Sequence, residues 1–296
     1  MTARILVGDC RQVLATLPEA SVQCVVTSPP YFGLRDYSVM GQIGREATVE
    51  EYVGQMVSVF RGVRRVLRDD GTVWLNLGDS YASGRMDGLK PKDLIGIPWR
   101  VAFALQADGW YLRSDIIWHK PNPMPERVTD RPTKAHEYLF LLTKAARYFY
   151  DADAVREPFV TENGMGWAKA VKTQDTMKIG GDNRRQQSMA GSGMASMRPG
   201  IGGRNRRTVW TIATRATKDA HFATFPPALI EPCIKAGSKT GDVVLDPFAG
   251  AGTTLLVAER LGRDSIGIEL NPTYADMAAS RIRKDAPMLA AVEVCA

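Results

Sequence analysis

Thr27-Ser28-Pro29-Pro30-Tyr31 follows a short apolar run at 22–26, which predicts a buried strand. Two consecutive prolines end that strand, because each fixes its own φ at roughly −65° and removes a backbone donor. Each proline also pushes the residue before it into extended geometry. The stretch therefore predicts a stiff turn that offers a hydroxyl, carbonyl acceptors and an aromatic face. Such a turn either only ends the strand or holds a flat ligand that donates hydrogen bonds, such as the amino group of a base.

Length and composition indicate a globular protein with a large core. The chain has 296 residues, of which 45% are hydrophobic and 24% charged. No apolar run approaches the roughly 18 residues of a membrane span, and the N-terminal residues lead directly into a strand-like segment rather than a signal peptide. Four cysteines and three histidines show neither pairing nor metal-ligand spacing. We therefore expect a cytoplasmic protein without a metal site and without a membrane anchor.

Segments typical of strands and helices alternate along most of the chain. Apolar runs that predict strands lie at 4–7, 22–26, 72–77, 112–118, 138–142, 243–245 and 265–268. Helical spacing of apolar residues lies at 12–17, 49–67, 93–107, 226–235, 252–260 and 272–283. Asp69-Asp70-Gly71 predicts a turn. Because the strands are apolar on both faces, we expect a parallel sheet that is covered by helices.

A second motif, at 243–254, predicts a strand, a Gly-rich turn and the start of a helix. Gly250 and Gly252 would let the backbone turn tightly and approach a ligand closely. Thr253 or Thr254 could cap the helix. No Gly-Lys-Ser/Thr follows, which excludes the phosphate loop of nucleotide triphosphatases.

The next strand ends at Glu269, where a carboxylate could accept hydrogen bonds from ribose hydroxyls. A Gly-rich turn with an acid at the end of the next strand predicts a nucleoside site that needs no pyrophosphate. The alternative is a structural turn next to a surface glutamate.

The net charge of +6 is concentrated in one segment. From Thr161 to Arg207 there are nine Lys or Arg and three Asp or Glu, a surplus of six, so the remainder is balanced. The region 159–207 is also rich in glycine and lacks apolar periodicity, which indicates an insert. A charge surplus confined to one insert favours a polyanion site over a merely solvated basic loop.

The two motifs together resemble those of the DNA amino-methyltransferases that use S-adenosylmethionine. The catalytic motif of that family is Asp, Asn or Ser followed by Pro-Pro and Tyr or Phe, and its cofactor motif is of the Asp-Pro-Phe-x-Gly-x-Gly-Thr-Thr type. Residues 28–31 match the first motif and residues 246–254 match the second. With the catalytic motif first, the chain resembles the circularly permuted β group, and the insert lies where that group keeps its target-recognition region.

The resemblance implies an α/β fold with a Rossmann-like, circularly permuted, seven-stranded methyltransferase sheet. The first two strands of the usual order would begin near Val243 and Ser265, and the third to seventh near Arg4, Val22, Thr72, Leu112 and Tyr138. It divides the chain into a catalytic part (1–158), a target-recognition insert (159–207), a cofactor-binding part (208–286) and a tail (287–296).

The resemblance also implies roles for residues. The Ser28 hydroxyl and the Pro29 carbonyl would accept hydrogens from the target amino group, on a backbone that Pro29 and Pro30 make stiff. Tyr31 would stack on the flipped base. The cofactor S-adenosyl-L-methionine would be bound by Asp9, Cys10, Thr224, Phe225, Asp246, Phe248, Ala249, Gly250, Gly252, Thr253 and Glu269. Double-stranded DNA would be bound by Lys120, Arg184, Arg185, Arg204, Arg206 and Arg207.

The motifs are compatible with more than one target and more than one class of protein. Ser at the first motif position is commoner in the family among cytosine-N4 enzymes, which favours cytosine N4 over adenine N6 as the target. A catalytically silent DNA-binding regulator, or a methyltransferase acting on RNA or a protein amide, are alternatives from other classes. Lys120 or His119 as a general base is less favoured than a pocket or phosphate role for Lys120. The recognition sequence, a partner restriction endonuclease and the oligomeric state are not specified.

Overall fold

A computed structural model gives the arrangement of the chain, and it describes residues 1–37, 39–84, 88–158, 203–214, 225–285 and 291–295. The chain forms two compact units. The first contains Met1–Tyr150 and Thr208–Ala296, and the second contains Asp151–Arg207.

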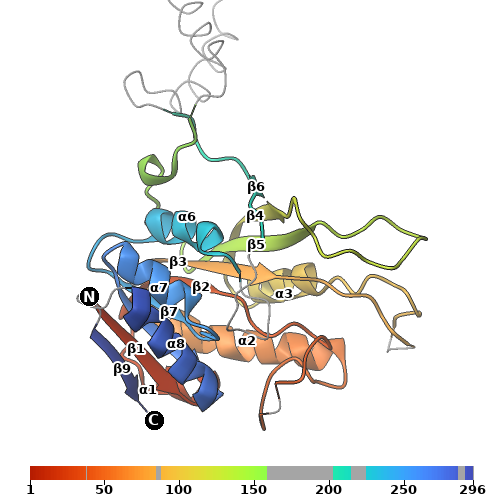
Figure 1. The fold of residues 1–296 in the computed structure, drawn as a ribbon, viewed down its shortest axis with the longest axis horizontal. Helices are drawn as coiled ribbons and strands as arrows, with labels where there is room; N and C mark the ends of the chain where they lie inside the picture. Colours follow the sequence, from red (N-terminus) through yellow and green to blue (C-terminus); the bar gives the residue numbers. More distant parts are fainter. Residues whose placement is uncertain (38, 85–87, 159–202, 215–224, 286–290, 296) are drawn as a thin grey trace, which may run out of the picture. The chain divides into compact units, whose positions relative to one another are not determined.

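The first unit is built on one sheet of nine strands in the order β6-β4-β5-β3-β2-β7-β8-β1-β9 (Figure 1). The strands are β1 (Thr2–Val7), β2 (Val22–Thr27), β3 (Leu67–Leu77), β4 (Tyr111–His119), β5 (His136–Thr143), β6 (Val209–Thr211), β7 (Val243–Asp246), β8 (Asp264–Glu269) and β9 (Ala291–Cys295). All seven expected strands are present. The strand that carries the Gly-rich turn, β7, pairs with β2 and β8 near the middle of the sheet although it comes late in the chain.

The expectation of a purely parallel sheet is wrong at one strand. β5 runs antiparallel to both of its neighbours, β3 and β4, whereas the other neighbouring strands pair in parallel. The β5 run is apolar, and an apolar run does not state the direction in which a strand enters the sheet. The start of β5 therefore lies at the edge of the sheet where the parallel strands end.

Two other expectations about local structure are corrected. Asp69-Asp70-Gly71 belongs to β3 and not to a turn, and the register between β2 and β3 shifts there instead. Gly71 serves close packing, since a Cβ at this position would lie 2.6 Å from Leu67 Cδ1. The expected tail at 287–296 contains β9, which pairs in parallel with β1. The edge strand β6 has three residues, too few for a pattern in the sequence.

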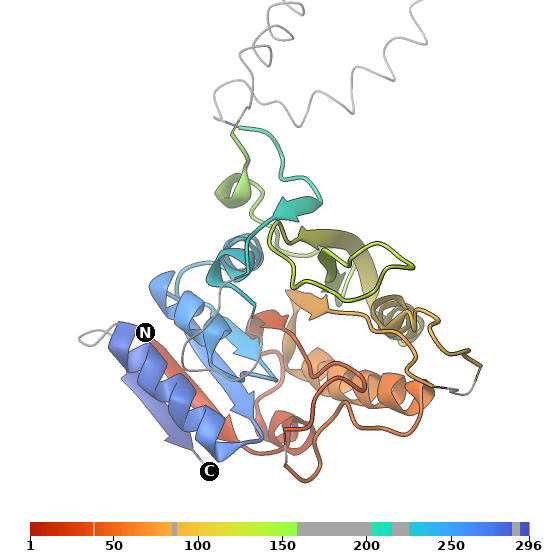
Figure 2. The same cartoon turned by 45° about the vertical axis from the view of Figure 1, so that its right-hand side comes forward.

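Two sets of helices cover the sheet. One set is α1 (Cys10–Thr16), α2 (Val49–Val66) and α3 (Ile97–Ala107), and the other is α6 (Pro227–Gly237), α7 (Thr253–Arg260) and α8 (Pro272–Asp285). The chain moves through the sheet in one direction from β2 to β3 and in the opposite direction from β7 to β8. Because crossovers between parallel strands are right-handed, the two sets lie on opposite faces (Figure 2). The topological switch point of the sheet, from which the chain continues in opposite directions, therefore lies between β2 and β7.

Local sequence explains the helix that supports the catalytic turn. α2 begins with a capping box, in which the Thr48 hydroxyl accepts from Glu51 N and the Glu51 carboxylate accepts from Thr48 N. Seven of its residues are buried along one stripe, Tyr52 among them. α3 begins at Ile97 rather than at the expected Asp93, because Pro98 suits a first turn and the Asp79 carboxylate accepts from Gly96 N and Ile97 N.

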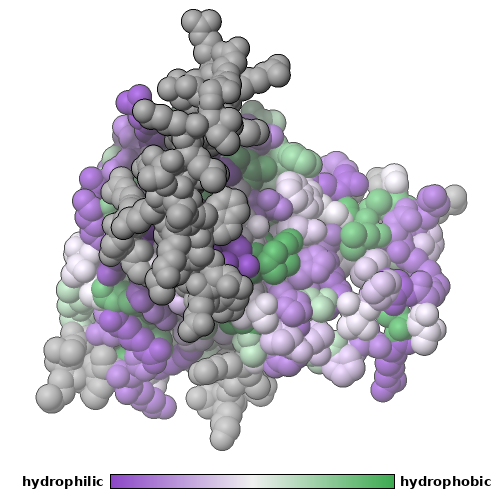
Figure 3. All heavy atoms as spheres, turned by 90° about the horizontal axis from the view of Figure 1, so that it is seen from above, coloured by the Kyte–Doolittle hydropathy of each residue, from purple (hydrophilic) through white to green (hydrophobic). Residues whose placement is uncertain are grey.

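Seen from above, the described surface is mainly hydrophilic with small separate hydrophobic groups (Figure 3). No helix within the described ranges is long and apolar enough to span a bilayer. In the second unit, Glu157 and Arg204 form an isolated antiparallel bridge at the base of the insert.

Candidate active site

The carboxyl ends of the parallel strands bring the two motifs together. Ser28 follows β2, Asp246 ends β7 and Glu269 ends β8, all at the same edge of the sheet. In open α/β sheets, ligands bind at this edge where the strand order changes sides. In this chain that position lies between β2 and β7, so the catalytic turn and the Gly-rich turn flank it.

Asp246 joins the two motifs directly. Its Oδ1 accepts from the Thr27 hydroxyl at 2.6 Å and from Phe248 N at 3.0 Å, and its Oδ2 accepts from the Thr254 hydroxyl at 2.8 Å. Burial raises the pKa of this carboxyl to about 6, against the hydrogen bonds from Thr27 and Thr254, which lower it. These bonds are internal, so Asp246 fixes the position of Ser28 relative to the Gly-rich turn.

The Ser28–Tyr31 turn presents acceptors at this point. The Tyr52 hydroxyl of α2 donates to the Pro30 carbonyl at 2.9 Å, which anchors the turn. No donor from the described residues binds the Pro29 carbonyl. Ser28 is half-buried, and its hydroxyl donates to Tyr31 Oη at 3.3 Å. The stiff turn therefore leaves one carbonyl and the lone pairs of one hydroxyl available for a ligand.

Tyr31 is held on two sides. A Cβ on Gly78, at the end of β3, would lie 2.4 Å from Tyr31 Cε2, so only glycine leaves room for the ring. The Tyr31 hydroxyl donates to Glu137 Oε2 at 2.7 Å. Burial, and then the charge of Glu137, raise the pKa of the Tyr31 phenol well above its usual value, so Tyr31 is a neutral donor.

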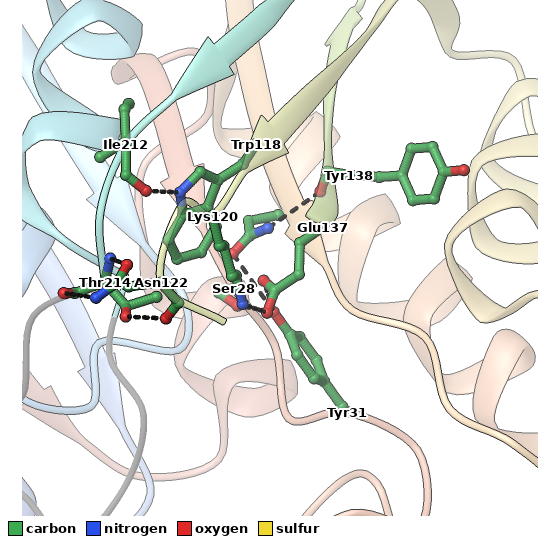
Figure 4. Close-up of polar contacts among 10 residues, drawn as sticks. Ser28, Tyr31, Trp118, Lys120, Asn122, Glu137, Tyr138, Ile212 and Thr214 are labelled. Carbon is green, nitrogen blue, oxygen red and sulfur yellow. Dashed lines mark hydrogen bonds and ion pairs between the residues drawn. The ribbon is translucent and has the colours of Figure 1, made fainter. Parts of the chain in front are cut away.

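Glu137 links this turn to Lys120. The Glu137 carboxylate lies between Tyr31 and Lys120 and forms an ion pair with Lys120 through Oε1 (Figure 4). Lys120 Nζ also lies 4.4 Å from the centroid of the Trp118 ring, in cation–π contact. Lys120, expected to line the pocket or to contact DNA phosphate, thus forms an ion pair beside the Ser28–Tyr31 turn.

Glu137 was not expected from the sequence. In a parallel strand, residue 137 would lie at the opposite edge of the sheet, away from Ser28. Because β5 is antiparallel, Glu137 pairs with Trp118 in β4 and reaches the ends of β2 and β3. The only signal in the sequence was an acidic residue at the start of an apolar strand.

The Gly-rich turn owes its glycines partly to packing. Gly252 has a φ of 71° and caps α7, so neither Thr253 nor Thr254 is the cap, contrary to expectation. A Cβ at Gly252 would lie 2.8 Å from Ala278 Cβ, so this glycine permits contact with α8. Arg281 of α8 donates to the Ala251 carbonyl at 3.0 Å and to the Thr253 hydroxyl at 2.9 Å. Gly252 and Thr253 therefore connect the turn to α8.

Glu269, at the end of β8, contacts the Gly-rich turn through its carboxylate. Its Oε2 accepts from Gly250 N at 2.8 Å, and its Oε1 accepts from Asn271 N at 2.9 Å. Burial raises the pKa of this carboxyl. Each oxygen keeps a lone pair for a ribose hydroxyl. Residues 246–254 contain no Lys or Arg, so the arrangement fits a nucleoside without phosphate.

The other expected cofactor residues differ in burial and in the elements that carry them. Asp9 caps α1, and its carboxylate accepts from Arg11 N at 2.9 Å; the side-chain hydrogen bond from Arg11 lowers its pKa. Cys10 is buried, and burial raises the pKa of its thiol to about 12, so it acts as a small apolar group. Ala249 is buried and Phe248 half-buried, Phe225 lies just before α6, and Thr224 lies outside the described residues.

The expected DNA-binding arginines are placed only in part. Glu157 Oε2 binds Arg204 Nε at 3.3 Å and Arg207 Nε at 3.0 Å, so both side chains take part in closing the base of the second unit. Arg206 lies between them in the sequence and is half-buried, and Arg184 and Arg185 lie outside the described residues. Over the described part of the chain, no group of three or more His, Cys, Asp or Glu could hold a metal ion.

Comparison with known proteins identifies this arrangement. Residues 22–280 match the N6/N4 methyltransferase family, described as DNA methylase. The Type II methyltransferase M.Cfr9I of Citrobacter freundii is 47% identical over 302 residues, which cover 95% of this chain and 88% of that protein. M.SmaI of Serratia marcescens is 45% identical over 302 residues, with 95% and 91% covered.

Solved structures of DNA methyltransferases are similar to this chain in fold. TTHA0409 of Thermus thermophilus, solved with S-adenosyl-L-methionine, is 29% identical with a TM-score of 0.64, over 99% of this chain and 100% of that one. PvuII DNA methyltransferase, which is cytosine-N4-specific, shares the fold at 20% identity with a TM-score of 0.69, over 99% and 95% of the two chains. The Rossmann-like α/β fold is confirmed, and the chain belongs to the N6/N4 family of DNA methyltransferases.

Proposed function

We propose that this DNA methyltransferase transfers the methyl group of S-adenosyl-L-methionine to N4 of cytosine in duplex DNA. The observation that carries the proposal is the 2.6 Å hydrogen bond between Thr27 and Asp246. This bond joins the turn that presents Ser28 to the turn that ends beside Glu269. A nucleoside held at Glu269 and an amino group held at Ser28 would therefore meet at the same edge of the sheet.

The chemistry asked of the chain is alignment. The amino nitrogen of cytosine is a weak nucleophile, because its lone pair is delocalised into the ring. Two acceptors on its hydrogens, Ser28 Oγ and the Pro29 carbonyl, draw the nitrogen toward tetrahedral geometry and localise that pair. Good alignment supplies roughly 7–11 kcal/mol in favourable systems. S-adenosyl-L-methionine supplies an activated methyl group on a sulfonium centre.

No dedicated base is assigned. The alkylated amine carries a positive charge and releases its proton readily, so neither His119 nor Lys120 is required for that task. The pairing of Lys120 with Glu137 supports this assignment, because the Lys120 ammonium is already charge-compensated. Lys120 instead supports the wall of the site.

The cofactor would lie along the ends of β7, β8 and β1. Glu269 would accept from the ribose hydroxyls, and the backbone of Gly250 would approach the nucleoside. Asp9, Cys10, Phe225, Phe248 and Ala249 are proposed to line it. Asp246, Gly252 and Thr253 support it from behind.

Duplex DNA would be bound mainly by phosphate contacts from the basic insert at 159–207, with the target base flipped toward Tyr31. Arg184 and Arg185 are proposed for DNA contact, and Arg204, Arg206 and Arg207 for the base of the insert. The names of the relatives support a role beside a restriction endonuclease of the same system. The serine hydroxyl of Ser28 favours cytosine N4 over adenine N6, in line with its distribution within the family.

Identifying the methylated nucleoside tests the proposal. Duplex DNA is incubated with the enzyme and isotopically labelled S-adenosyl-L-methionine, digested to nucleosides and analysed by mass. We expect labelled N4-methylcytosine. Labelled N6-methyladenine would overturn the choice of base. The absence of label in DNA, with cofactor bound, would favour a silent DNA-binding protein, and label transferred preferentially to competing RNA would assign the activity to RNA.

A further inference from the structure

We propose that Glu137 is a positioning residue for methyl transfer, because through Tyr31 it turns the Ser28 hydroxyl proton away from the target amino group. The inference rests on the proposed function, in which Ser28 Oγ accepts a hydrogen from that group. A serine hydroxyl can donate or accept, so the role requires something that fixes its direction. The chain from Lys120 through Glu137 and Tyr31 to Ser28 supplies it (Figure 4).

The direction of the Tyr31 hydroxyl is set first. Apart from Ser28, its single hydrogen has two acceptors within reach, namely Glu137 Oε2 at 2.7 Å and Asn76 Oδ1 at 3.4 Å. Asn76 Nδ2 donates to the Tyr138 carbonyl at 3.0 Å, which turns Oδ1 toward Tyr31. The shorter, charged acceptor takes the hydrogen, because hydrogen bonds to ionised groups are about twice as strong as neutral ones. The Glu137 carboxylate, which forms an ion pair with Lys120, can only accept.

The direction of the Ser28 hydroxyl follows. Since the Tyr31 hydrogen points to Glu137, the Tyr31 oxygen presents a lone pair toward Ser28 Oγ, 3.3 Å away. Among the described residues this oxygen is the acceptor that the Ser28 hydroxyl reaches. With its proton on that side, Ser28 Oγ keeps its lone pairs for the incoming amino group. No proton is transferred along the chain, which only sets orientation.

Replacing Glu137 by Gln reverses this arrangement. Lys120 Nζ can only donate, so the Gln carbonyl faces Lys120 and the Gln amide NH₂ faces Tyr31. Tyr31 then receives a hydrogen and directs its own toward Ser28 Oγ or Asn76. Ser28 loses its fixed direction as an acceptor, although the shape of the site hardly changes.

Single-turnover methylation of duplex DNA measures the effect, together with the Kd of S-adenosyl-L-methionine and the thermal midpoint. For Glu137→Gln we expect a rate about 10-fold lower, the size of one neutral hydrogen bond, with the cofactor Kd within about twofold of the parent. Tyr31→Phe, which removes the linking hydroxyl, should lower the rate by a similar factor. The control Glu231→Gln, on the outer face of α6 where Glu231 pairs with Lys235, should react at the parent rate.

The double variant Glu137→Gln with Tyr31→Phe separates orientation from general support. Because both changes act through one hydroxyl, we expect the double variant to react within about threefold of the slower single variant. A parent rate in Glu137→Gln, or a double variant slower by the product of the two single effects, would overturn the proposal. Ser28→Ala in the same assay distinguishes the two levels. A fully active Ser28→Ala contradicts the proposed function, whereas an inactive Ser28→Ala beside a fully active Glu137→Gln contradicts only the role of Glu137.

Discussion

The hydrogen bond between Thr27 and Asp246, which connects the two motifs, predicts a dependence of stability on pH. Thr27→Val keeps the shape of a fully buried side chain and removes the hydroxyl that donates to Asp246 at 2.6 Å. Asp246 then keeps its hydrogen bonds from Thr254 and Phe248 only. The pKa of Asp246 is about 6, so the acceptor that loses this donor is charged at pH 8 and mostly neutral at pH 5.

The magnitude follows from the charge of the acceptor. A hydrogen bond to a charged group contributes roughly 1.5–3 kcal/mol and a neutral one roughly 0.5–1.5 kcal/mol. Because the folded pKa of Asp246 lies above its usual value, this carboxyl favours folding most below about pH 3.8, and the contribution is lost as the pH rises through about 6. The Thr27 hydrogen bond lowers the pKa of Asp246, so the folded pKa of this carboxyl is higher in Thr27→Val than in the parent. The variant therefore loses more stability than the parent as the pH rises. We expect a destabilisation of about 2 kcal/mol at pH 8 and about 1 kcal/mol at pH 5.

Urea unfolding at the two pH values measures this difference. Thr143→Val is the matched control, since Thr143 is also fully buried but donates to a neutral acceptor, the Ala145 carbonyl, at 2.9 Å. The control should cost about 1 kcal/mol at both pH values. The reasoning is refuted if Thr27→Val costs the same at pH 5 and pH 8, or less than the control at pH 8.

Two further substitutions test the site from its other sides. Gly78→Ala places a Cβ 2.4 Å from Tyr31 Cε2, so the ring must move, and we expect the single-turnover rate to fall by about 10-fold or more with the cofactor Kd unchanged; an unchanged rate would show that the ring position is unimportant. Glu269→Gln replaces the carboxylate proposed to bind ribose, and calorimetry should show a cofactor Kd about 10-fold weaker; unchanged affinity would remove Glu269 from the cofactor site.

The sequence predicted those parts of the site that depend on local pattern. The double proline after an apolar run located the catalytic turn, and the Gly-rich turn located the second motif. The two motifs lie close together because parallel strands end at the same edge of a sheet. Thr27 and Asp246, 219 residues apart, confirm that closeness with a direct hydrogen bond.

The features that the sequence did not predict depend on pairing between segments that are distant in the chain. The direction of β5 is set by its contacts with β3 and β4, and an apolar run at 138–142 carries no sign of it. Glu137 was hidden for that reason alone. β9 exists because Ala291–Cys295 pairs with β1, although its sequence suggested a tail. The sequence did not show that Gly252 also packs against Ala278 of α8, 26 residues further along the chain, or that its φ of 71° favours glycine.

The role of Ser28 is the central claim, and Ser28→Ala tests it most directly. The substitution removes one acceptor from a half-buried position and leaves the Thr27–Asp246 joint intact. The measurement is the single-turnover rate of methyl transfer to duplex DNA, with the Kd values for DNA and S-adenosyl-L-methionine determined on the same preparation. We predict a rate lower by about 100-fold or more, the loss typical of one transition-state hydrogen bond, with both Kd values within about twofold of the parent. Methyl transfer by Ser28→Ala within a few-fold of the parent rate would contradict the account.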